Sequence, residues 1–272
     1  MKKVLYTLTI IVLLAVFAFS AFQVVTYFVE SKKQAEILDE LAQIKQEALQ
    51  AATTPATTPE DPEENVGDEA TEPESTEETE PQILPQYAEL HEMNSDMVAW
   101  ITIPGTRVDY PVMQTPDRPN FYLERNFNKS RSAQGCLYAR EECDLLKPSD
   151  NITIYGHNML NGSMFAALHE YIDKEKWDEN NLIFFDTLYE CHVYEIFAVF
   201  KTSASLDYGF RYHQLIDAES EEAFDAFIAE CKQLAFYDTG ITPEYGDKLI
   251  CLSTCEYTLA NGRLVVAARR IS

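Results

Sequence analysis

A long uncharged stretch near the amino terminus constrains this chain more than any other feature. Residues 4–29 carry no charged side chain, and 21 of these 26 residues are hydrophobic. As a helix rising about 1.5 Å per residue, the stretch reaches about 39 Å, more than the roughly 30 Å hydrocarbon core of a bilayer. We therefore predict a cytoplasmic tip and transmembrane anchor over residues 1–30. A cleavable signal peptide is the alternative, but its apolar region usually has only about 7 to 15 residues.

Two segments of different character follow the anchor. Residues 31–50 carry apolar residues at roughly helical spacing between charges, which predicts a juxtamembrane helix. Residues 51–86 contain eleven acidic and no basic side chains and consist largely of Thr, Pro and Glu. Such a segment cannot bury apolar surface and repels itself, so we predict a disordered acidic linker that holds the next domain away from the membrane.

The overall charge excludes some classes of partner. The chain has 45 acidic and 21 basic side chains, for a formal net charge of -24. Nucleic-acid binding depends on an excess of Lys and Arg, which this sequence lacks, and the same balance argues against any other anionic surface. Almost half of the imbalance lies in the predicted linker, so the remaining chain is only moderately acidic.

Residues 87–272 have the composition of one globular domain. The stretch from Met97 to Met113 alternates β-branched and aromatic residues around a Pro-Gly turn, which predicts a pair of strands. Helical periodicity appears at Ser163–Ile172 and Ala218–Leu234. The strands follow one another too closely for regular βαβ units, so we predict a mainly antiparallel sheet closed into a barrel with added helices. Further strands are expected at Gly135–Tyr138, Ile152–Tyr155, Leu182–Asp186, His192–Lys201, Lys248–Thr254 and Arg263–Arg270.

One of the six cysteines has neighbours that can carry chemistry. The apolar run Leu249–Leu252 predicts a buried strand that ends near Cys255, and a turn containing Asn261 and Gly262 leads into the next strand. An antiparallel hairpin would bring Arg263 beside Cys255, where its charge favours a thiolate and can stabilise an oxyanion. Taken alone, Cys255 fits a core residue at the end of a strand better than a nucleophile. The cysteines show no zinc-type spacing, four of them fit small buried residues, and Cys143 in a charged loop fits either environment. Those four are Cys136, Cys191, Cys231 and Cys251.

A cysteine nucleophile also needs a proton partner, usually a histidine. His157 directly follows the strand ending YG and precedes a loop that contains glycine. Catalytic groups often occupy such strand ends, although a turn histidine has the same position. The contexts of the other four histidines need only exposed or edge positions; these are His91, His169, His192 and His213.

These motifs together resemble a known family. The segments YGHNM at 155–159 and LSTC at 252–255, followed by Arg263 and the run LVVAAR, are similar to the His, Cys and Arg motifs of the sortases, specifically class B. Residues 99–114 are similar to the early strands of that family, and the helix near 218–234 falls where class B has its added helix. The resemblance implies a sortase-type closed β-barrel and a cysteine transpeptidase.

The resemblance also implies roles for individual residues. Cys255 is the nucleophile that attacks the Thr carbonyl of a sorting signal similar to NPxTx, His157 is the acid/base, and Arg263 stabilises the oxyanion. The protein is then transferred to an amine, such as one in a cell-wall peptide. Substrate-binding positions of the family match four residues here: Ser253, Glu256, Leu123 and Tyr208. For Glu256, a solvated loop acid is an equally good interpretation.

The compartment and partners follow from the same resemblance. A sortase acts outside the cell, so the amino terminus is expected in the cytoplasm and the catalytic domain outside, with sorting-signal proteins as partners. No cofactor is implied, no acidic loop resembles the calcium site of class A, and disulfides are not expected beside an active thiol. The alternatives are a pilus-type sortase that polymerises pilins, a cysteine endopeptidase of papain type, or a non-catalytic membrane-tethered binding module. Papain-type enzymes place the Cys before the His, the reverse of the order here.

Overall fold

The computed structural model describes residues 2–53, 81–205 and 208–272. Most of the predicted acidic linker, residues 54–80, therefore lies outside the described residues. Within the described ranges the chain forms α1 (Lys2–Thr53), α2 (Pro85–Met93), β1 (Met97–Thr102), β2 (Asp109–Met113), η1 (Phe121–Glu124), β3 (Leu137–Ala139), β4 (Asn151–Tyr155), η2 (Phe165–Ile172), α3 (Lys174–Glu179), β5 (Leu182–Thr187), β6 (Cys191–Ser203), η3 (Tyr212–Gln214), α4 (Glu221–Leu234), β7 (Leu249–Glu256) and β8 (Gly262–Arg270), where η marks a 3₁₀ helix.

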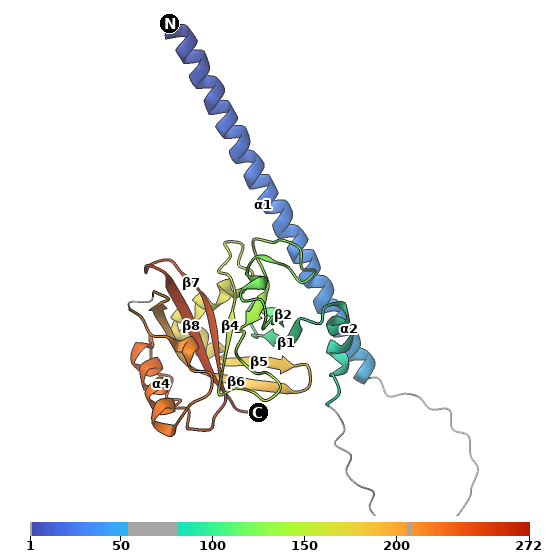
Figure 1. The fold of residues 1–272 in the computed structure, drawn as a ribbon, viewed down its shortest axis with the longest axis vertical. Coiled ribbons are helices and arrows are strands. Elements are labelled where there is room, and N and C mark those ends of the chain that lie inside the picture. The colour runs from blue at the N-terminus through green and yellow to red at the C-terminus, as the bar shows by residue number, and fades with distance from the viewer. Residues whose placement is uncertain (1, 54–80, 206–207) are drawn as a thin grey trace, which may run out of the picture.

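The described strands close into a barrel in the order β1-β2-β3-β4-β7-β8-β6-β5 (Figure 1). Six of the neighbouring pairs are antiparallel, and two, β2 with β3 and β4 with β7, are parallel. The predicted mainly antiparallel closed barrel with added helices is therefore confirmed. Because β4 and β7 run parallel, their carboxyl ends meet at the same end of the barrel, which decides where the site forms.

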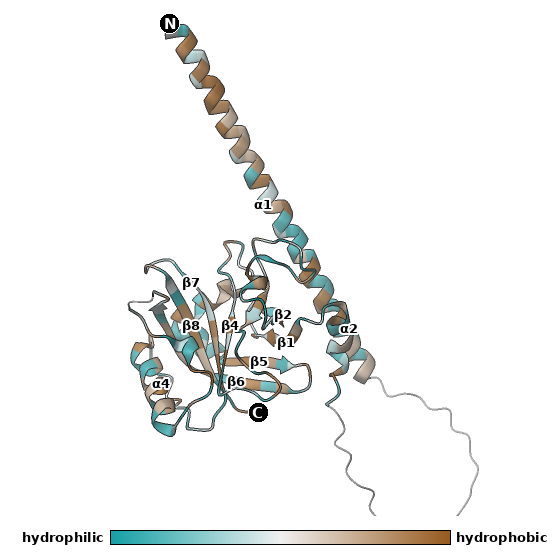
Figure 2. Cartoon of the chain, viewed as in Figure 1, coloured by the Kyte–Doolittle hydropathy of each residue, from teal (hydrophilic) through white to brown (hydrophobic). Residues whose placement is uncertain are grey.

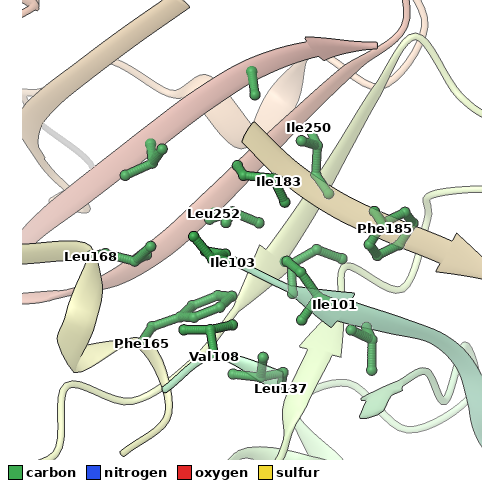
Figure 3. Packing of buried hydrophobic residues seen from close by; sticks show 14 of the residues in the cluster. Ile101, Ile103, Val108, Leu137, Phe165, Leu168, Ile183, Phe185, Ile250 and Leu252 are labelled. Atoms are coloured by element: carbon green, nitrogen blue, oxygen red, sulfur yellow. The ribbon is translucent and has the colours of Figure 1, made fainter. Parts of the chain in front are cut away.

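β-branched, aliphatic and aromatic side chains from different strands fill the barrel interior. Figure 3 shows Ile101 of β1, Ile183 of β5 and Leu252 of β7 together inside the barrel, with Phe165 of η2 close to Val108. All five side chains are buried. Full burial of such a side chain contributes about 1.5–3 kcal/mol each, so this cluster holds the strands in register.

The helical predictions are correct in place and differ in detail. The predicted helix Ala218–Leu234 begins only at Glu221, because the Ser220 side chain accepts a hydrogen bond from the Ala223 N–H and caps the helix there. Its apolar face covers the outer side of β6, β7 and β8. The predicted helix Ser163–Ile172 is a 3₁₀ helix over Phe165–Ile172.

The predicted anchor and juxtamembrane helix form one continuous helix, α1. Its amino-terminal part stands clear of the barrel and is largely hydrophobic (Figures 1 and 2), and it is long and apolar enough to cross a membrane. Its carboxyl-terminal part packs against α2 and the barrel, where Leu38 and Leu41 are buried. Lys45 Nζ lies 2.6 Å from Asp109 Oδ1 and 4.3 Å from the centre of the Trp100 ring.

The role of residues 51–86 as a spacer stays a prediction, because most of that segment lies outside the described residues. Helix α1 contacts the barrel before that segment begins, and the helix itself continues to Thr53. The apolar stripe of residues 31–50 made a helix predictable, but the stripe alone did not indicate that the barrel would be its partner. The domain is therefore held directly against the helix that leads to the predicted anchor.

Candidate active site

Cys255 lies where β7 emerges from the buried interior. Residues Leu249–Thr254 are all buried, because the barrel core lies on one face of the strand and α4 covers part of the other. Cys255 is the first residue of β7 that is only half-buried. The strand therefore presents one accessible thiol on a rigid support.

The predicted hairpin of β7 and β8 pairs Cys255 with Arg263. Directly paired residues on neighbouring antiparallel strands place their side chains on the same face, with Cβ atoms about 5 Å apart. Arg263 Nη1 donates to the carbonyl oxygen of Gly262 at 2.9 Å and to that of Asn261 at 3.5 Å. A guanidinium has five N–H groups, so donors remain for an oxyanion that forms beside the thiol.

His157 reaches the same end of the barrel because β4 runs parallel to β7. The register pairs Tyr155 with Ser253, so the residue two positions past Tyr155 lies near Cys255. Gly156 is needed between them, since a Cβ there would lie 2.4 Å from the Leu137 side chain. His157 Nε2 lies 2.8 Å from the Leu123 carbonyl oxygen. A carbonyl only accepts, so Nε2 carries a proton and Nδ1 is free to exchange one.

A cavity of about 410 Å³ joins these side chains. Cys255, His157 and Arg263 all line it, and so do Ser253 and Leu123. Ser253 is buried, and its hydroxyl lies 2.6 Å from the Tyr212 hydroxyl. The remaining lining is mostly aromatic or charged and includes Asn120, Tyr138, Arg140, Glu141, Glu142, Tyr155, Tyr212 and His213.

Glu256 is buried rather than a solvated loop acid, and it does not line the cavity. Its side chain is buried, accepts from the backbone N–H groups of Thr258 and Leu259, and lies 3.0 Å from Lys201 Nζ. Burial by itself would raise the pKa of this carboxyl, but the hydrogen bonds from Thr258 and Lys201 outweigh it and lower the pKa to about 2. Glu256 therefore holds the turn that leads from β7 to Arg263.

Tyr208 does not line the Cys255 cavity. It is 57% exposed and borders a separate hollow formed by the end of β6, α4 and the β7–β8 turn, together with Leu259 and Leu234. The structure therefore brings Leu123 and Ser253 to the cavity and leaves Tyr208 and Glu256 outside it.

Two residues that the sequence did not single out hold the main chain of Cys255. Asn158 Nδ2 donates to the Cys255 carbonyl oxygen at 3.2 Å, and His169 Nε2 lies 3.1 Å from the same oxygen. Asn158 Nδ2 also lies 3.0 Å from His169 Nε2, so the amide, the imidazole and the Cys255 carbonyl form one cluster. Asn158 directly follows His157, and His169 lies on η2, so these contacts fix β7 relative to the loop that carries His157.

A second histidine, His213 on η3, also lines the cavity. Burial lowers the pKa of His213, and the nearby Arg140 and Arg211 guanidinium groups lower it further. The imidazole is therefore neutral at pH 7. The sequence context of His213, charged and far from any motif, gave no signal for this position.

All six cysteines are free. Cys136, Cys231 and Cys251 are buried as expected, and Cys143, which was open, is also buried, whereas Cys191 is exposed at the start of β6. Burial raises the pKa of the Cys136 and Cys251 thiols well above the usual range. In the described ranges, His, Cys, Asp and Glu side chains form no group that could hold a metal ion.

The chain is similar in sequence and structure to known proteins of one family. Residues 101–271 match the Sortase domain family. Sortase B from Listeria monocytogenes is 29% identical over 268 residues, which cover 96% of this chain and 95% of the relative. The Staphylococcus aureus sortase B–substrate complex matches with a TM-score of 0.72 and 23% identity over 90% of this chain and 99% of the other. A sortase B complexed with triglycine matches with a TM-score of 0.71 and 22% identity over 89% and 99%.

Proposed function

Because this chain belongs to the sortase family, whose members are cysteine transpeptidases, we propose that its reaction runs through Cys255, His157 and Arg263. The class B resemblance predicted from the sequence is confirmed by the similarity to curated sortase B proteins. We further propose that residues 87–272 are the catalytic domain and that the substrate is a protein with an NPxTx-like sorting signal near its carboxyl terminus.

One observation carries the assignment of the three residues. The antiparallel pairing of β7 with β8 and the parallel pairing of β4 with β7 bring a thiol, an imidazole and a guanidinium to one cavity. His157 is about a hundred residues from the hairpin that carries Cys255 and Arg263, and the three residues belong to three different strands or strand ends. A half-buried thiol beside a cation and a proton carrier is the arrangement that acyl transfer needs.

In the first half of the reaction, the Cys255 thiolate attacks the carbonyl carbon of the signal Thr. The carbonyl oxygen becomes an oxyanion, which the free N–H groups of Arg263 stabilise. Protonated His157 then gives its proton to the amide nitrogen, the C–N bond breaks, and the carboxyl-terminal peptide leaves with a free amine. The product is a thioester between the Thr acyl group and Cys255.

In the second half, an amine acceptor attacks the thioester carbonyl. His157 accepts the proton that the attacking amine loses, a new amide bond forms, and the Cys255 thiolate departs. Glu141 and Glu142 line the cavity and would attract an incoming ammonium group. The neighbour solved with triglycine supports oligoglycine as the first acceptor to test. We propose an amine of the cell wall as the natural acceptor.

We also propose that the amino-terminal part of α1 anchors the enzyme in the membrane, with the amino terminus in the cytoplasm and the barrel outside. The support is the uncharged apolar stretch of α1, all of it exposed between residues 3 and 25. Such a surface is unstable in water and stable in lipid.

The test is turnover of a fluorogenic NPxTx-type peptide by the full chain in detergent, with and without triglycine, and with Cys255→Ala as the control. A ligated product that depends on triglycine and disappears in Cys255→Ala supports the proposal. Hydrolysis of unrelated sequences would instead indicate a cysteine endopeptidase, and binding of the signal without turnover would indicate a binding module. Preference for a lysine side chain of a pilin over wall amines would replace the anchoring role by pilin polymerisation.

A further inference from the structure

We propose that the loop between β4 and η2, residues 159–162, lies in the headgroup layer of the bilayer, with the Leu160 side chain in contact with lipid. This inference rests on the proposed anchoring by α1. Beyond the anchoring, it identifies the part of the catalytic domain that touches the membrane and therefore the direction in which the cavity faces.

The depth of this loop follows from one hydrogen bond to α1. Asn161 Nδ2 donates to Ser31 Oγ at 2.8 Å, and Ser31 is two residues past the end of the uncharged stretch. At a typical tilt of about 20°, the 26-residue stretch exceeds the hydrocarbon core by about 7 Å, so Ser31 lies about 6 Å outside the core if the excess is shared equally. The headgroup layer is itself about 5 to 7 Å thick. Asn161 is therefore at the level of the headgroups.

The barrel cannot move away from this level while its contacts with α1 persist. Gln34 Nε2 donates to the Gly135 carbonyl oxygen at 3.2 Å, and Lys45 pairs with Asp109 at 2.6 Å. These contacts lie on the helix beyond Ser31 and fix the domain along the helix axis. The height of the loop is thus set by the rigid helix rather than by a flexible tether.

Other parts of the protein begin to cover α1 within the last residues of the uncharged stretch. Residues 3–25 are exposed throughout, whereas Thr26 and Tyr27 are half-buried. The Tyr27 hydroxyl is buried and has no hydrogen-bond partner in the part of the chain that the structure describes. Tyrosine is enriched at the interface between bilayer and water. The protein around α1 therefore extends to the level of that interface.

Leu160 itself serves no purpose in the packing of the fold. It is 98% exposed, whereas Met159 packs against the barrel core and Met164 is buried. Transfer of an exposed leucine side chain from water to an apolar environment contributes about 1.5–3 kcal/mol. A bilayer at the level of Asn161 provides that environment.

The charges beside Leu160 fit phospholipid headgroups. Arg107 is exposed and donates from Nη1 to the Asn161 carbonyl oxygen at 3.0 Å, and Lys32 and Lys33 are exposed on α1 next to Ser31. Glu30 is the acidic residue at the same level of the helix. The expectation from the net charge of the chain, which disfavoured any anionic surface, therefore does not hold locally at this end.

The proposal fixes the direction of the active site. His157 lies three residues before Leu160, and Figure 1 shows the β7–β8 hairpin on the side of the barrel from which the amino-terminal part of α1 departs. The cavity then faces the membrane surface. It is suited to a peptide segment that directly adjoins a membrane span of its own protein.

The experiment places a tryptophan at the loop tip of the full chain. Leu160→Trp is reconstituted in nanodiscs of equal parts phosphatidylglycerol and phosphatidylcholine, with or without bromine on the acyl chains near the headgroup. The matched control is Leu146→Trp, since Leu146 is 64% exposed and precedes β4, at the opposite end of that strand. Emission of the wild-type chain is subtracted to remove Trp100 and Trp177.

We expect bromine to quench the added Leu160→Trp emission about twofold or more, with no quenching of Leu146→Trp. Equal emission of Leu160→Trp in both kinds of nanodisc would overturn the loop contact. Flotation of the chain with lipid tests the anchoring proposal separately from the loop contact. A chain that floats with lipid and shows no quenching retains its anchor, whereas a chain that does not float has lost the anchoring premise as well.

A second variant measures the consequence for catalysis. Leu160→Asp should transfer a membrane-spanning substrate in the same nanodisc about fivefold more slowly, because the enzyme and signal are no longer held at one level. Turnover of a soluble signal peptide should be unchanged. An equal loss on both substrates would show that Leu160 acts in the cavity and would contradict the proposal.

Discussion

His157 and Arg263 in the Cys255 cavity are held in a different way from Asp109 in the contact between α1 and the barrel. At the helix contact, Asp109 accepts hydrogen bonds from Lys45, Trp100 and Thr102. In the cavity, every hydrogen bond that His157 and Arg263 make within the described part of the chain goes to a main-chain carbonyl.

The difference separates a paired charge that stabilises the fold from the side chains that we propose take part in the reaction. Burial would raise the pKa of Asp109, but Lys45 and Trp100 outweigh it and lower the pKa, so the carboxylate and its cation neutralise each other. A carbonyl, by contrast, holds a cationic side chain in place without cancelling its charge. His157 and Arg263 are thus both oriented by carbonyl groups, and the charge of Arg263 remains available for the oxyanion of the proposed reaction.

The largest effect should come from removing the group around which the cavity charges are arranged. Cys255→Ala is expected to lower ligation of a signal peptide to triglycine about 10⁴-fold or more, because no other group in the cavity can form the thioester. Product formation is measured by mass spectrometry. Cys191→Ala, which removes an exposed thiol at the start of β6, is the control and should be fully active. Substantial ligation by Cys255→Ala would remove it as the nucleophile.

Replacing Arg263 tests whether the carbonyl-held cation acts by its shape. Arg263→Lys keeps the charge but loses the planar fork, so kcat/KM should fall about 10²-fold. The matched control is Arg131→Lys, whose side chain is 85% exposed and pairs loosely with Glu124 at 3.6 Å. Steady-state rates close to those of the unmodified chain in Arg263→Lys would contradict the oxyanion role.

Glu256 is a paired carboxylate that stabilises the fold, although it is adjacent to Cys255 in the sequence. Its folded-state pKa of about 2 lies below the ordinary value of 4.5, so its stabilisation is complete above pH 4.5 and declines as the pH falls toward 2. Glu256→Gln should lower the free energy of unfolding by about 2 kcal/mol at pH 7 and by little near pH 2. Urea unfolding of the detergent-solubilised chain measures this. The exposed Glu124→Gln is the control, and a difference that does not vary with pH would show that the carboxylate charge is not responsible.

His169 tests whether a contact with the Cys255 main chain affects the rate. His169→Ala should lower kcat about tenfold with KM and melting temperature nearly unchanged, because Cys255 is less firmly oriented. His169→Gln, whose amide can donate to the same carbonyl, should recover most of the rate. If Ala and Gln behave alike in steady-state kinetics, the hydrogen bond does not position the thiol.

The smallest effect is expected at the helix contact. Asp109→Asn should weaken the docking of α1 by about 1 kcal/mol, seen as faster amide exchange over residues 34–45. Turnover of a soluble signal peptide should stay the same, since the contact is remote from the thiol. Glu36→Gln, which breaks only an exposed pair with Lys32, is the control. Reduced turnover in Asp109→Asn would mean that the two regions are coupled.

The sequence pattern predicted the strands and the β7–β8 hairpin, because these features depend on residues close together in the chain. The apolar run before Cys255 and the turn at Asn261 and Gly262 predicted a hairpin, and its register placed Arg263 opposite Cys255. The β-branched runs likewise located the strands. The position of His157 became meaningful only through the family resemblance, because the parallel pairing of β4 with β7 joins segments almost a hundred residues apart.

The remaining features depend on contacts that leave no sequence pattern. His169 bonds a main-chain carbonyl, so no particular residue type at the other end reveals its partner. Glu256 was ambiguous because burial of a loop acid depends on Lys201 from a different strand. Tyr208 was transferred by resemblance, and here it borders a different hollow.

The buried free thiols lie in different parts of the molecule, so their alkylation rates can report local unfolding of each part. Cys136 lies in the packing between α1, α2 and the barrel, Cys143 in the hydrophobic cluster that includes the barrel core, and Cys231 and Cys251 in the layer beneath α4. With Cys255 and Cys191 already alkylated, the rate at which each remaining thiol reacts measures how often its own layer separates. A single mass-spectrometric time course would thus rank the stabilities of the three layers without any engineered label.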